Sequence, residues 1–208
     1  MWLYVLLAVL AGYLLGNLNG SIIMSQLLDH KDVRDQGSGN AGLTNFLRMY
    51  GPSSAIAVIA IDMVKAFSAC LIGKALLAPH GYALEGVLIG GLSVNIGHDF
   101  PAFFGFRGGK GVLCGITAAL AADWQCALLV IAVFALCLWL TRYVSLSSIL
   151  GSATFAISFA IVHWGQTYAV IMGIALPMLI IFMHRSNIGR LLKGTERKAT
   201  FSKFRKNK

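Results

Sequence analysis

Long apolar runs and short polar, glycine-rich stretches alternate along this 208-residue chain. The apolar runs are longer than the roughly 9–11 residues of a transmembrane barrel strand, and they do not alternate apolar with polar positions. They therefore predict helices, each needing about 20 apolar residues to cross a bilayer, or fewer where a helix end is buried in protein. We expect seven helices, over residues 2–28, 52–78, 84–98, 108–122, 124–141, 147–163 and 166–184. The pair on either side of Asp123 could equally be one helix.

The composition agrees with a membrane protein. Hydrophobic residues make up 57% of the chain and charged residues 12%, whereas soluble domains carry about 25% charged residues. The mean hydropathy is +0.74. A soluble core of this size could not bury so much apolar surface. We therefore predict one all-α integral membrane domain over residues 1–208, with a basic tail at 185–208.

The basic residues indicate how the helices are oriented. In a seven-helix arrangement, segments 29–51, 99–107 and 142–146 share one side with the tail. With Lys110 at the helix edge, that side holds every lysine and arginine except Lys65 and Lys74. Because positively charged loops stay in the cytoplasm, we expect the N-terminus outside and the C-terminus in the cytoplasm. The polar, glycine-rich stretches lie on this same side, which predicts a site open to the cytosol.

The net charge of +9 does not require a nucleic-acid partner. Much of it lies in the tail, where basic residues beside a membrane set topology and contact anionic lipids. No base-stacking pattern accompanies the charge, so we expect no nucleic-acid binding. The four cysteines lie in apolar segments without C-x-x-C spacing, so we expect packing residues and no metal site.

The first polar stretch, "DQGSGNAGLTN", covers residues 35–45. Its glycines can take positive φ and turn backbone N–H groups toward an anion, and its side chains add hydrogen-bond donors. Arg48 follows and can bind a phosphate with two parallel hydrogen bonds. The stretch predicts a phosphate site, with a plain turn and helix cap as the alternative. The glycines are Gly37, Gly39 and Gly42, and the donors are Ser38, Thr44 and Asn45.

The second polar stretch, "GHDFPAFFGFRGGKGV", covers residues 97–112. Two cations among three glycines form a second candidate anion site, and a following helix N-terminus would add its dipole. The alternative is a basic loop that only sets topology. His98, where a helix meets this loop, is either a base or a buried interfacial histidine. The cations are Arg107 and Lys110, and the glycines are Gly108, Gly109 and Gly111.

Two later stretches carry polar residues on the same side. In "RYVSLSSI", the serines Ser145, Ser147 and Ser148 are interpreted as caps of the next helix. In "HRSNIGRLLKGTE", helical spacing places His184 and Asn187 on one face. A structural ion pair is the expected role of Glu196, which is the single acid among many bases there.

Two further pairs of residues could carry chemistry. Asp62 and Lys65 lie one turn apart inside a predicted span, where ionisable groups are functional candidates; we favour a structural pair. His30 and Asp35 match the H-x-x-x-x-D signature of another glycerolipid acyltransferase class, a match that also arises by chance. We do not assign a base to that pair.

Taken together, these stretches resemble the bacterial acyl-phosphate:glycerol-3-phosphate acyltransferases over the whole chain. "GSGNAGLTNFLR", "GHDFPAFFGFRGGKGV", "RYVSLSS" and "HRSNIGRLLKGTE" match the family motifs in order. The family commonly has a serine and a proline near Asn17 to Asn19, so this chain departs from the family pattern at the end of the first predicted helix. The resemblance implies a multi-pass enzyme of the bacterial plasma (inner) membrane with its active site on the cytoplasmic side.

The resemblance also implies the reaction and the residues. The acyl group of acyl phosphate passes to the 1-hydroxyl of sn-glycerol 3-phosphate, giving lysophosphatidic acid and inorganic phosphate without a cofactor or metal. The implied catalytic residues are Ser38, Arg48, Lys110, His184 and Asn187. The implied substrate-binding residues are Gly37, Gly39, Asn40, Gly42, Thr44, Asn45, His98, Gly108, Gly109, Gly111 and Ser145, and Glu196 would hold the tail.

Several alternatives remain open at the level of sequence. The hydroxyl proton could pass to His184, to His98 or to the donor phosphate, and either glycine-rich stretch could hold either phosphate. No motif in the sequence indicates which acyl chain is preferred. The sequence also leaves the oligomeric state open, with a monomer as one of the options. A small polytopic transporter or channel for an anionic metabolite, lined by Asp62 and Lys65, is the rival function.

Overall fold

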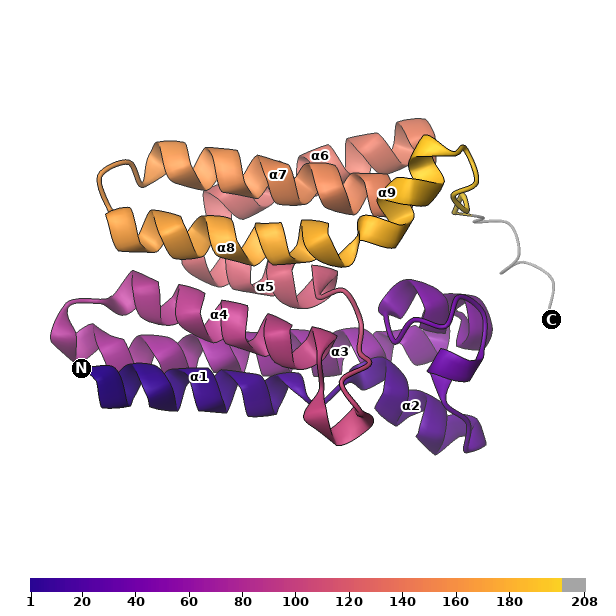
Figure 1. Ribbon diagram of the computed structural model, residues 1–208, viewed down its shortest axis with the longest axis horizontal. Coiled ribbons are helices and arrows are strands. Elements are labelled where there is room, and N and C mark those ends of the chain that lie inside the picture. The colour runs from indigo at the N-terminus through magenta and orange to yellow at the C-terminus, as the bar shows by residue number, and fades with distance from the viewer. Residues whose placement is uncertain (200–208) are drawn as a thin grey trace. The chain divides into compact units, whose positions relative to one another are not determined.

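The computed structural model describes residues 1–199, so residues 200–208 of the predicted tail lie outside the described residues. The described chain forms nine α-helices and three short 3-10 turns and has no strand (Figure 1). It packs as two compact units, Met1–Ala118 and the part from Ala119 onward. The all-α prediction is confirmed, and a single domain over residues 1–208 stays a prediction.

The first unit holds most of the glycine-rich sequence. Its helices are α1 (Trp2–Gly16), α2 (Gly20–Asp29), α3 (Leu43–Leu77) and α4 (Ala83–Asp99), with turns η1 (Val33–Asp35), η2 (Ala78–His80) and η3 (Ala102–Phe104). Helix α5 (Val112–Ala122) begins in this unit and ends beyond it. The second unit contains α6 (Trp124–Thr141), α7 (Val144–Val162), α8 (Thr167–Met183) and α9 (Arg185–Leu192).

Small residues let α1, α3 and α4 pack backbone to backbone. A Cβ on Gly90 of α4 would collide with the carbonyl oxygen of Ala69, and a Cβ on Gly97 would collide with that of Tyr13. Membrane helices associate through such close contacts because lipid supplies no hydrophobic driving force between them. The packing holds α4, which the second glycine-rich loop follows, against α1 and against α3, which the first glycine-rich loop precedes.

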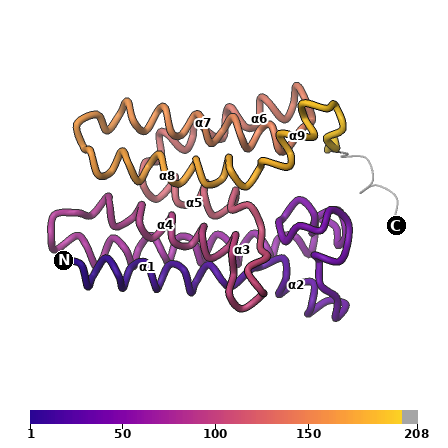
Figure 2. Tube along the Cα trace, in the orientation of Figure 1, coloured from indigo at the N-terminus to yellow at the C-terminus, as the bar shows by residue number. Residues whose placement is uncertain are grey.

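The prediction of one helix over residues 2–28 is wrong in detail. The chain breaks after α1, and the break can be followed along the trace in Figure 2. Asn19 caps α2 by accepting a hydrogen bond from the Ile22 amide through Oδ1 at 3.1 Å. Asparagine is a strong N-cap because its side chain satisfies a free amide of the first turn. The break therefore forms without the proline that is common in the family.

Helix α3 begins well before the predicted residue 52. Its first part starts at Leu43 and reaches a kink at Gly51, where φ is 80° and ψ is 176°. Pro52 follows and starts the second part, because proline lacks an N–H and is tolerated in a first turn. The later end of the first polar stretch is therefore helical, and it was expected to be a loop.

Two other helix starts differ from the sequence-based bounds. Helix α5 starts at Val112 instead of residue 108 because Gly111 takes a φ of 64°. Helix α7 starts at Val144, so the interpretation of the serines as caps is wrong. The Ser147 and Ser148 hydroxyls instead donate to carbonyls one turn earlier in the chain, both at 2.9 Å.

The chain around Asp123 forms two separate helices. Asp123 caps α6 by accepting hydrogen bonds from the amides of Gln125 (2.9 Å) and Cys126 (3.0 Å). Its carboxyl also lies 3.0 Å from Nε2 of His163, which follows α7. This contact joins the two connections at one end of the second unit.

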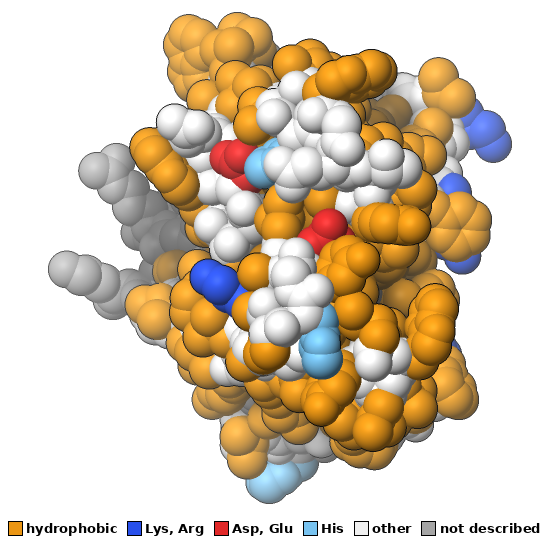
Figure 3. All heavy atoms as spheres, turned by 90° about the vertical axis from the view of Figure 1, so that its left-hand side faces the viewer, with side chains coloured by type: hydrophobic (Ala, Val, Ile, Leu, Met, Phe, Trp, Pro, Cys, Tyr) orange, Lys and Arg blue, Asp and Glu red, His pale blue; other side chains and the backbone are white. Residues whose placement is uncertain are grey.

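Four segments are long and apolar enough to cross a membrane, and the bent pair α8–α9 would make a fifth. The four are Trp2–Asp29, Leu43–His80, Trp124–Thr141 and Val144–Val162. Helix α5 is apolar but shorter. Hydrophobic side chains cover most of the face drawn in Figure 3, with few charges among them. These segments agree with the predicted membrane protein, while seven crossings and their orientation stay predictions.

Candidate active site

Asn45 shapes the first glycine-rich loop from inside the first unit. Its side-chain Oδ1 accepts the Ser38 amide at 2.8 Å, and its Nδ2 donates to the carbonyls of Val33 and Gln36, both at 3.0 Å. The residue is only 2% exposed. Because both Nδ2 hydrogens are donated to the backbone, the amide holds the loop in shape and leaves Ser38 exposed above it.

The glycines of this loop divide by conformation. Gly37 and Gly39 take positive φ (62° and 72°), as the sequence predicts. Gly42 instead has an extended backbone (φ −110°) and is the N-cap of α3. Thr44 and Arg48 then lie one turn apart on the first part of α3. The loop thus ends at a helix N-terminus, where the dipole favours an anion.

The second glycine-rich loop folds back onto the end of α4. The Gly108 amide donates to the Asp99 carbonyl (3.0 Å), and the Gly109 amide donates to the His98 carbonyl (3.1 Å). A Cβ on Gly108 would collide with the His98 carbonyl oxygen, which explains why the position requires glycine. These two amides therefore bind α4, and Lys110 and Gly111 lead directly into the N-terminus of α5.

Arg34 joins the two loops. Its Nη1 donates to the carbonyl oxygens of Phe104 (2.6 Å) and Arg107 (2.8 Å), and its other nitrogens bind the Asp32 carboxylate. The side-chain hydrogen bond from Arg34 is the main cause that holds the pKa of Asp32 below its usual value. Sequence reasoning missed Arg34, because nothing in "HKDVRD" shows that its partners lie beyond residue 100.

Asn17, at the end of α1, supports the same region. It accepts the Phe103 amide through Oδ1 at 3.1 Å, and the Tyr13 hydroxyl donates to the Phe100 carbonyl at 3.0 Å. The break between α1 and α2 places Asn17 where its side chain can hydrogen-bond the backbone of the second loop. The asparagines that replace the usual family residues remain part of the structure around the site.

Asp62 and Lys65 form the structural pair that the sequence favours. Lys65 Nζ lies 2.7 Å from Asp62 Oδ1, and both side chains are 2% exposed. This pairing removes the main support for a transporter, which required these charges to line a pathway. The His30 and Asp35 side chains are both exposed, and His30 caps α2 in the left-handed conformation.

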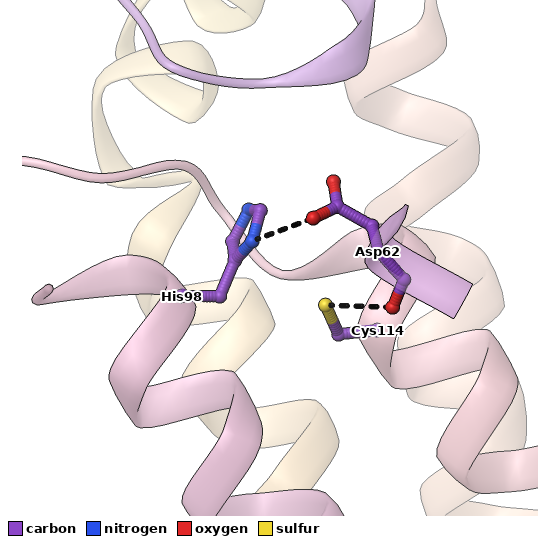
Figure 4. A group of neighbouring side chains, drawn as sticks. All are labelled: Asp62, His98 and Cys114. Carbon is purple, nitrogen blue, oxygen red and sulfur yellow. Dashed lines mark hydrogen bonds and ion pairs between the residues drawn. The ribbon is translucent and has the colours of Figure 1, made fainter. Parts of the chain in front are cut away.

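Asp62, His98 and Cys114 lie close enough to suggest a metal site (Figure 4). The His98 ring points toward the Asp62 carboxyl, while the Cys114 thiol points to the Asp62 carbonyl at 3.8 Å. The Lys65 ammonium, however, lies within hydrogen-bonding distance of both Asp62 and His98, at 2.7 and 2.9 Å. A cation already bridges these two groups, so a metal ion would have to displace it.

In the second unit, two predicted site residues, Ser145 and Asn187, meet Arg190 at Glu196. Ser145 Oγ and Asn187 Nδ2 donate to its Oε1, both at 2.7 Å, and Arg190 Nε donates to Oε2 at 2.6 Å. Burial alone would raise the pKa of the Glu196 carboxyl, but the hydrogen bonds from Asn187, Ser145 and Arg190 outweigh it and hold the pKa below its ordinary value. The structural role predicted for Glu196 is confirmed.

His184 lies at the junction of α8 and α9, which are bent by 56° to each other (Figure 1). It is 3% exposed, and its Nδ1 lies 2.8 Å from the Ile180 carbonyl oxygen. A carbonyl only accepts hydrogen bonds, so Nδ1 carries the hydrogen and Nε2 is the acceptor nitrogen of the neutral ring. In this form, Nε2 carries the lone pair that can accept a proton.

The first unit therefore brings the two predicted loops together. The Ala41 carbonyl oxygen of the first loop is 3.2 Å from where a Cβ on Gly109 of the second would lie. The second unit brings Ser145 and Asn187 together through Glu196. A pocket that combines residues of both units stays a prediction from the motifs.

Comparison with known proteins extends this picture. The family model described as glycerol-3-phosphate acyltransferase matches residues 6–194. Relatives of that name are 41% identical over 196 residues in Thermoanaerobacter sp. (strain X514) and 40% identical over 198 residues in Clostridioides difficile (strain 630). Each match covers 94% of this chain, and 96% and 95% of the respective relative.

A solved structure is similar as well. It is the glycerol 3-phosphate form of PlsY (YgiH), described as an integral membrane glycerol 3-phosphate acyltransferase. The TM-score is 0.83 at 33% identity, covering 94% of this chain and 96% of the other. Fold and comparisons define the class as an integral membrane acyltransferase of phospholipid biosynthesis. Within that class, the chain belongs to the glycerol-3-phosphate acyltransferase family.

Proposed function

We propose that this protein transfers the acyl group of acyl phosphate to the 1-hydroxyl of sn-glycerol 3-phosphate. The hydroxyl oxygen attacks the acyl carbon, the carbon–oxygen bond to phosphate breaks, and the products are lysophosphatidic acid and inorganic phosphate. The observation that carries the proposal is the pairing of two glycine-rich loops, each with a basic residue, through Arg34. Two such loops suit two substrates that each carry a phosphate.

The enzyme has to position the two substrates, and it does not have to form a covalent intermediate with either. Acyl phosphate is a mixed anhydride with a good leaving group, so no enzyme nucleophile is needed. The two phosphates repel each other, and Arg48 and Lys110 would offset that repulsion while the hydroxyl is oriented. We propose that these cations make a metal ion unnecessary.

The predicted residues then have distinct tasks. We propose that Ser38, Asn40, Thr44 and Arg48 bind one substrate at the start of α3, and that Lys110 and Gly111 bind the other at the start of α5. The structure supports a shaping role for Asn45, Gly108 and Gly109, because their amide groups are bonded within the loops or to α4. Ser145, His184 and Asn187 would complete the pocket, as the motifs predict.

The hydroxyl proton has two acceptors in this proposal. One is His184 Nε2, supported by the tautomer that the Ile180 carbonyl fixes. The other is the phosphate of the donor, which would leave with the proton. We place the reaction at the cytoplasmic face of a bacterial plasma membrane, because the basic loops and tail predict that side.

A direct assay tests the proposal. Purified protein in several detergents and lipid bilayers is given palmitoyl phosphate and glycerol 3-phosphate, and both phosphate release and lysophosphatidic acid are measured. We expect both products in equal amounts, and no phosphate release above background without glycerol 3-phosphate. Palmitoyl-CoA replaces palmitoyl phosphate in a parallel reaction that is expected to give no product. Absence of lysophosphatidic acid in every condition, compared with a no-enzyme reaction, would refute the proposed reaction.

A further inference from the structure

A buried lysine, Lys65, lies between the break that separates α1 from α2 and the end of α4. Lys65 Nζ is 2.7 Å from Asp62 Oδ1, 2.8 Å from the Leu18 carbonyl oxygen and 2.9 Å from His98 Nδ1. The Gly16 carbonyl oxygen is slightly farther, at 3.3 Å. Asp62 Oδ1 also accepts the Gly20 amide at 3.2 Å, so the pair connects the α1–α2 break with α3 and α4.

The hydrogens of the Lys65 ammonium determine which atoms of this cluster donate and which accept hydrogen bonds. A lysine ammonium has three hydrogens and no lone pair, so it can only donate. Its three shortest contacts, Asp62, the Leu18 carbonyl and His98 Nδ1, match those three hydrogens. His98 Nδ1 must therefore accept, which requires a neutral ring with its hydrogen on Nε2. A protonated ring would point an N–H at the ammonium from 2.9 Å, in a site where His98 is 4% exposed.

The opposite edge of the His98 ring faces the second loop. A Cβ on Gly109 would collide with His98 Nε2, and the Ala41 carbonyl of the first loop is close to the same position. The Gly109 amide is also bonded to the His98 carbonyl at 3.1 Å. The Nε2–H group thus lies where the two glycine-rich loops approach each other.

We propose that Lys65 is a positioning residue that holds His98 as the neutral Nε2–H tautomer, which makes His98 a hydrogen-bond donor to a substrate phosphate oxygen. His98 is then not the base of the reaction. This inference rests on the proposed function for the identity of the ligand, but the tautomer itself does not. It excludes His98, which the sequence left open as an acceptor of the hydroxyl proton, and agrees with the two acceptors of the proposed reaction, His184 and the donor phosphate.

The surroundings of the ring contain few other titratable groups. Asp62 and Lys65 face it from α3, Cys114 faces it from α5, and Asp99 is its neighbour on α4. Neither carboxylate oxygen of Asp99 has a hydrogen-bond partner among the described residues. The ammonium of Lys65 is the group in direct contact with Nδ1, so replacing it is the sharpest perturbation.

Histidine nitrogen NMR of the whole protein in nanodiscs tests the tautomer without any substrate. The His98 signals are assigned by their loss in His98→Gln. We expect the Nε2–H tautomer, unchanged between about pH 6 and 8, where an unperturbed histidine titrates. An Nδ1–H tautomer, or a ring that becomes protonated in this range, would overturn the proposal.

The double variant Asp62→Asn/Lys65→Met tests the role of the lysine. Removing both charges avoids leaving one of them buried and unpaired, which would endanger folding. We expect a folded protein in which the His98 ring shows both tautomers or titrates. Thermal unfolding confirms that the variant is folded. A pure, non-titrating Nε2–H tautomer in the folded double variant would show that Lys65 does not control the tautomer of His98.

Should the double variant fail to fold, Lys65→Arg provides the comparison. Its guanidinium can still donate to Nδ1, so this variant is expected to keep the wild-type tautomer.

Two substitutions of His98 test whether this residue acts as a hydrogen-bond donor or as the base of the reaction. The side-chain nitrogen of glutamine can reach the Nε2 position and donate, whereas asparagine reaches only the Nδ1 position. We expect His98→Gln to keep kcat within about tenfold, and His98→Asn to raise a substrate KM by about tenfold or more, as loss of one hydrogen bond to a charged group predicts. Equal loss of kcat in both variants, with loss of the acidic limb of the pH–rate profile, would make His98 the base. If the wild-type protein forms no lysophosphatidic acid, the transferase proposal fails while the NMR result still decides the tautomer.

Discussion

Arg34 Nη1 lies 2.6 Å from the carbonyl oxygen of Phe104, a residue 70 positions later in the chain. The same nitrogen donates to the Arg107 carbonyl at 2.8 Å, so one guanidinium holds the first loop against the second. Phe104 ends the turn η3, and Arg107 lies between η3 and α5, where the chain forms no helix. The relative position of the two predicted phosphate sites therefore depends on Arg34.

Arg34→Lys is expected to reduce phosphate release by about tenfold or more, because the single nitrogen of lysine cannot occupy the separate positions of Nε, Nη1 and Nη2 that bind Asp32 and the two carbonyls. Both substrate KM values should rise, since the change separates the loops without removing a ligand. Steady-state kinetics with each substrate varied provide the measurement. Lys31→Ala is the matched control, because Lys31 is 68% exposed and pairs only with Asp29 among the contacts described. Equal activity of Arg34→Lys and the control would contradict the bridging role.

Asn45→Ala and Asn45→Asp are both expected to destabilise the protein and reduce activity. Each leaves the Val33 and Gln36 carbonyls without the Nδ2 donor, and each buried unpaired group costs about 1–3 kcal/mol. Aspartate restores an acceptor for the Ser38 amide but places a charge against two carbonyls, so it should do no better than alanine. Thermal unfolding and kinetics on both variants test this. Wild-type behaviour of Asn45→Asp would mean that the donated hydrogen bonds are unimportant.

Arg48→Ala and Lys110→Ala are expected to differ in kinetics. Loss of Arg48 should lower kcat by about 100-fold or more, as removal of a group that stabilises transition-state charge does. Loss of Lys110 should chiefly raise the KM for acyl phosphate. Circular dichroism and thermal unfolding establish that both variants are folded. A selective rise in the KM for glycerol 3-phosphate in Lys110→Ala would assign the second loop to that substrate instead.

The hydrogen bonds that Glu196 accepts from Ser145, Asn187 and Arg190 are expected to weaken in acid. Hydrogen bonds hold the pKa of Glu196 below its ordinary value of 4.5. A carboxyl with a lowered folded-state pKa stabilises the fold fully above its unfolded pKa and loses that contribution as the pH falls through the folded value. The melting temperature of the wild type should therefore fall below about pH 4.5 more steeply than that of Glu196→Gln. Parallel curves for the two proteins would show that the carboxylate does not stabilise the tail.

Chelation is expected to leave the reaction rate unchanged. The Lys65 ammonium bridges Asp62 and His98, which are two of the three possible metal ligands in that cluster. The assay is repeated after prolonged dialysis against EDTA, with and without added Mg²⁺ or Zn²⁺. A rate that falls on dialysis and returns with one of these ions would establish a metal requirement.

The sequence by itself determined the class of the protein and the location of its chemistry. Apolar runs of membrane length must form helices, because backbone groups in lipid can be satisfied only within them. The two glycine-rich stretches, Arg48 and Lys110 stand out because their residue types suit phosphate, and the order of the motifs indicated the family. The Asp62–Lys65 pair was also predictable, since three residues span one helical turn.

Only the tertiary structure decided how these pieces act on one another. Helix packing brought Arg34 to Phe104 and Lys65 to His98, and local spacing carries no information about such distant contacts. It also gave Asn45 and the Gly108 and Gly109 amides a shaping role, because their hydrogen bonds are made within the fold. Local propensity favoured Ser145, Ser147 and Ser148 as helix caps. In the fold, Ser147 and Ser148 bond carbonyls one turn earlier, and Ser145 bonds Glu196. The residue types were fixed by the chain, but the partner of each polar atom was fixed by packing.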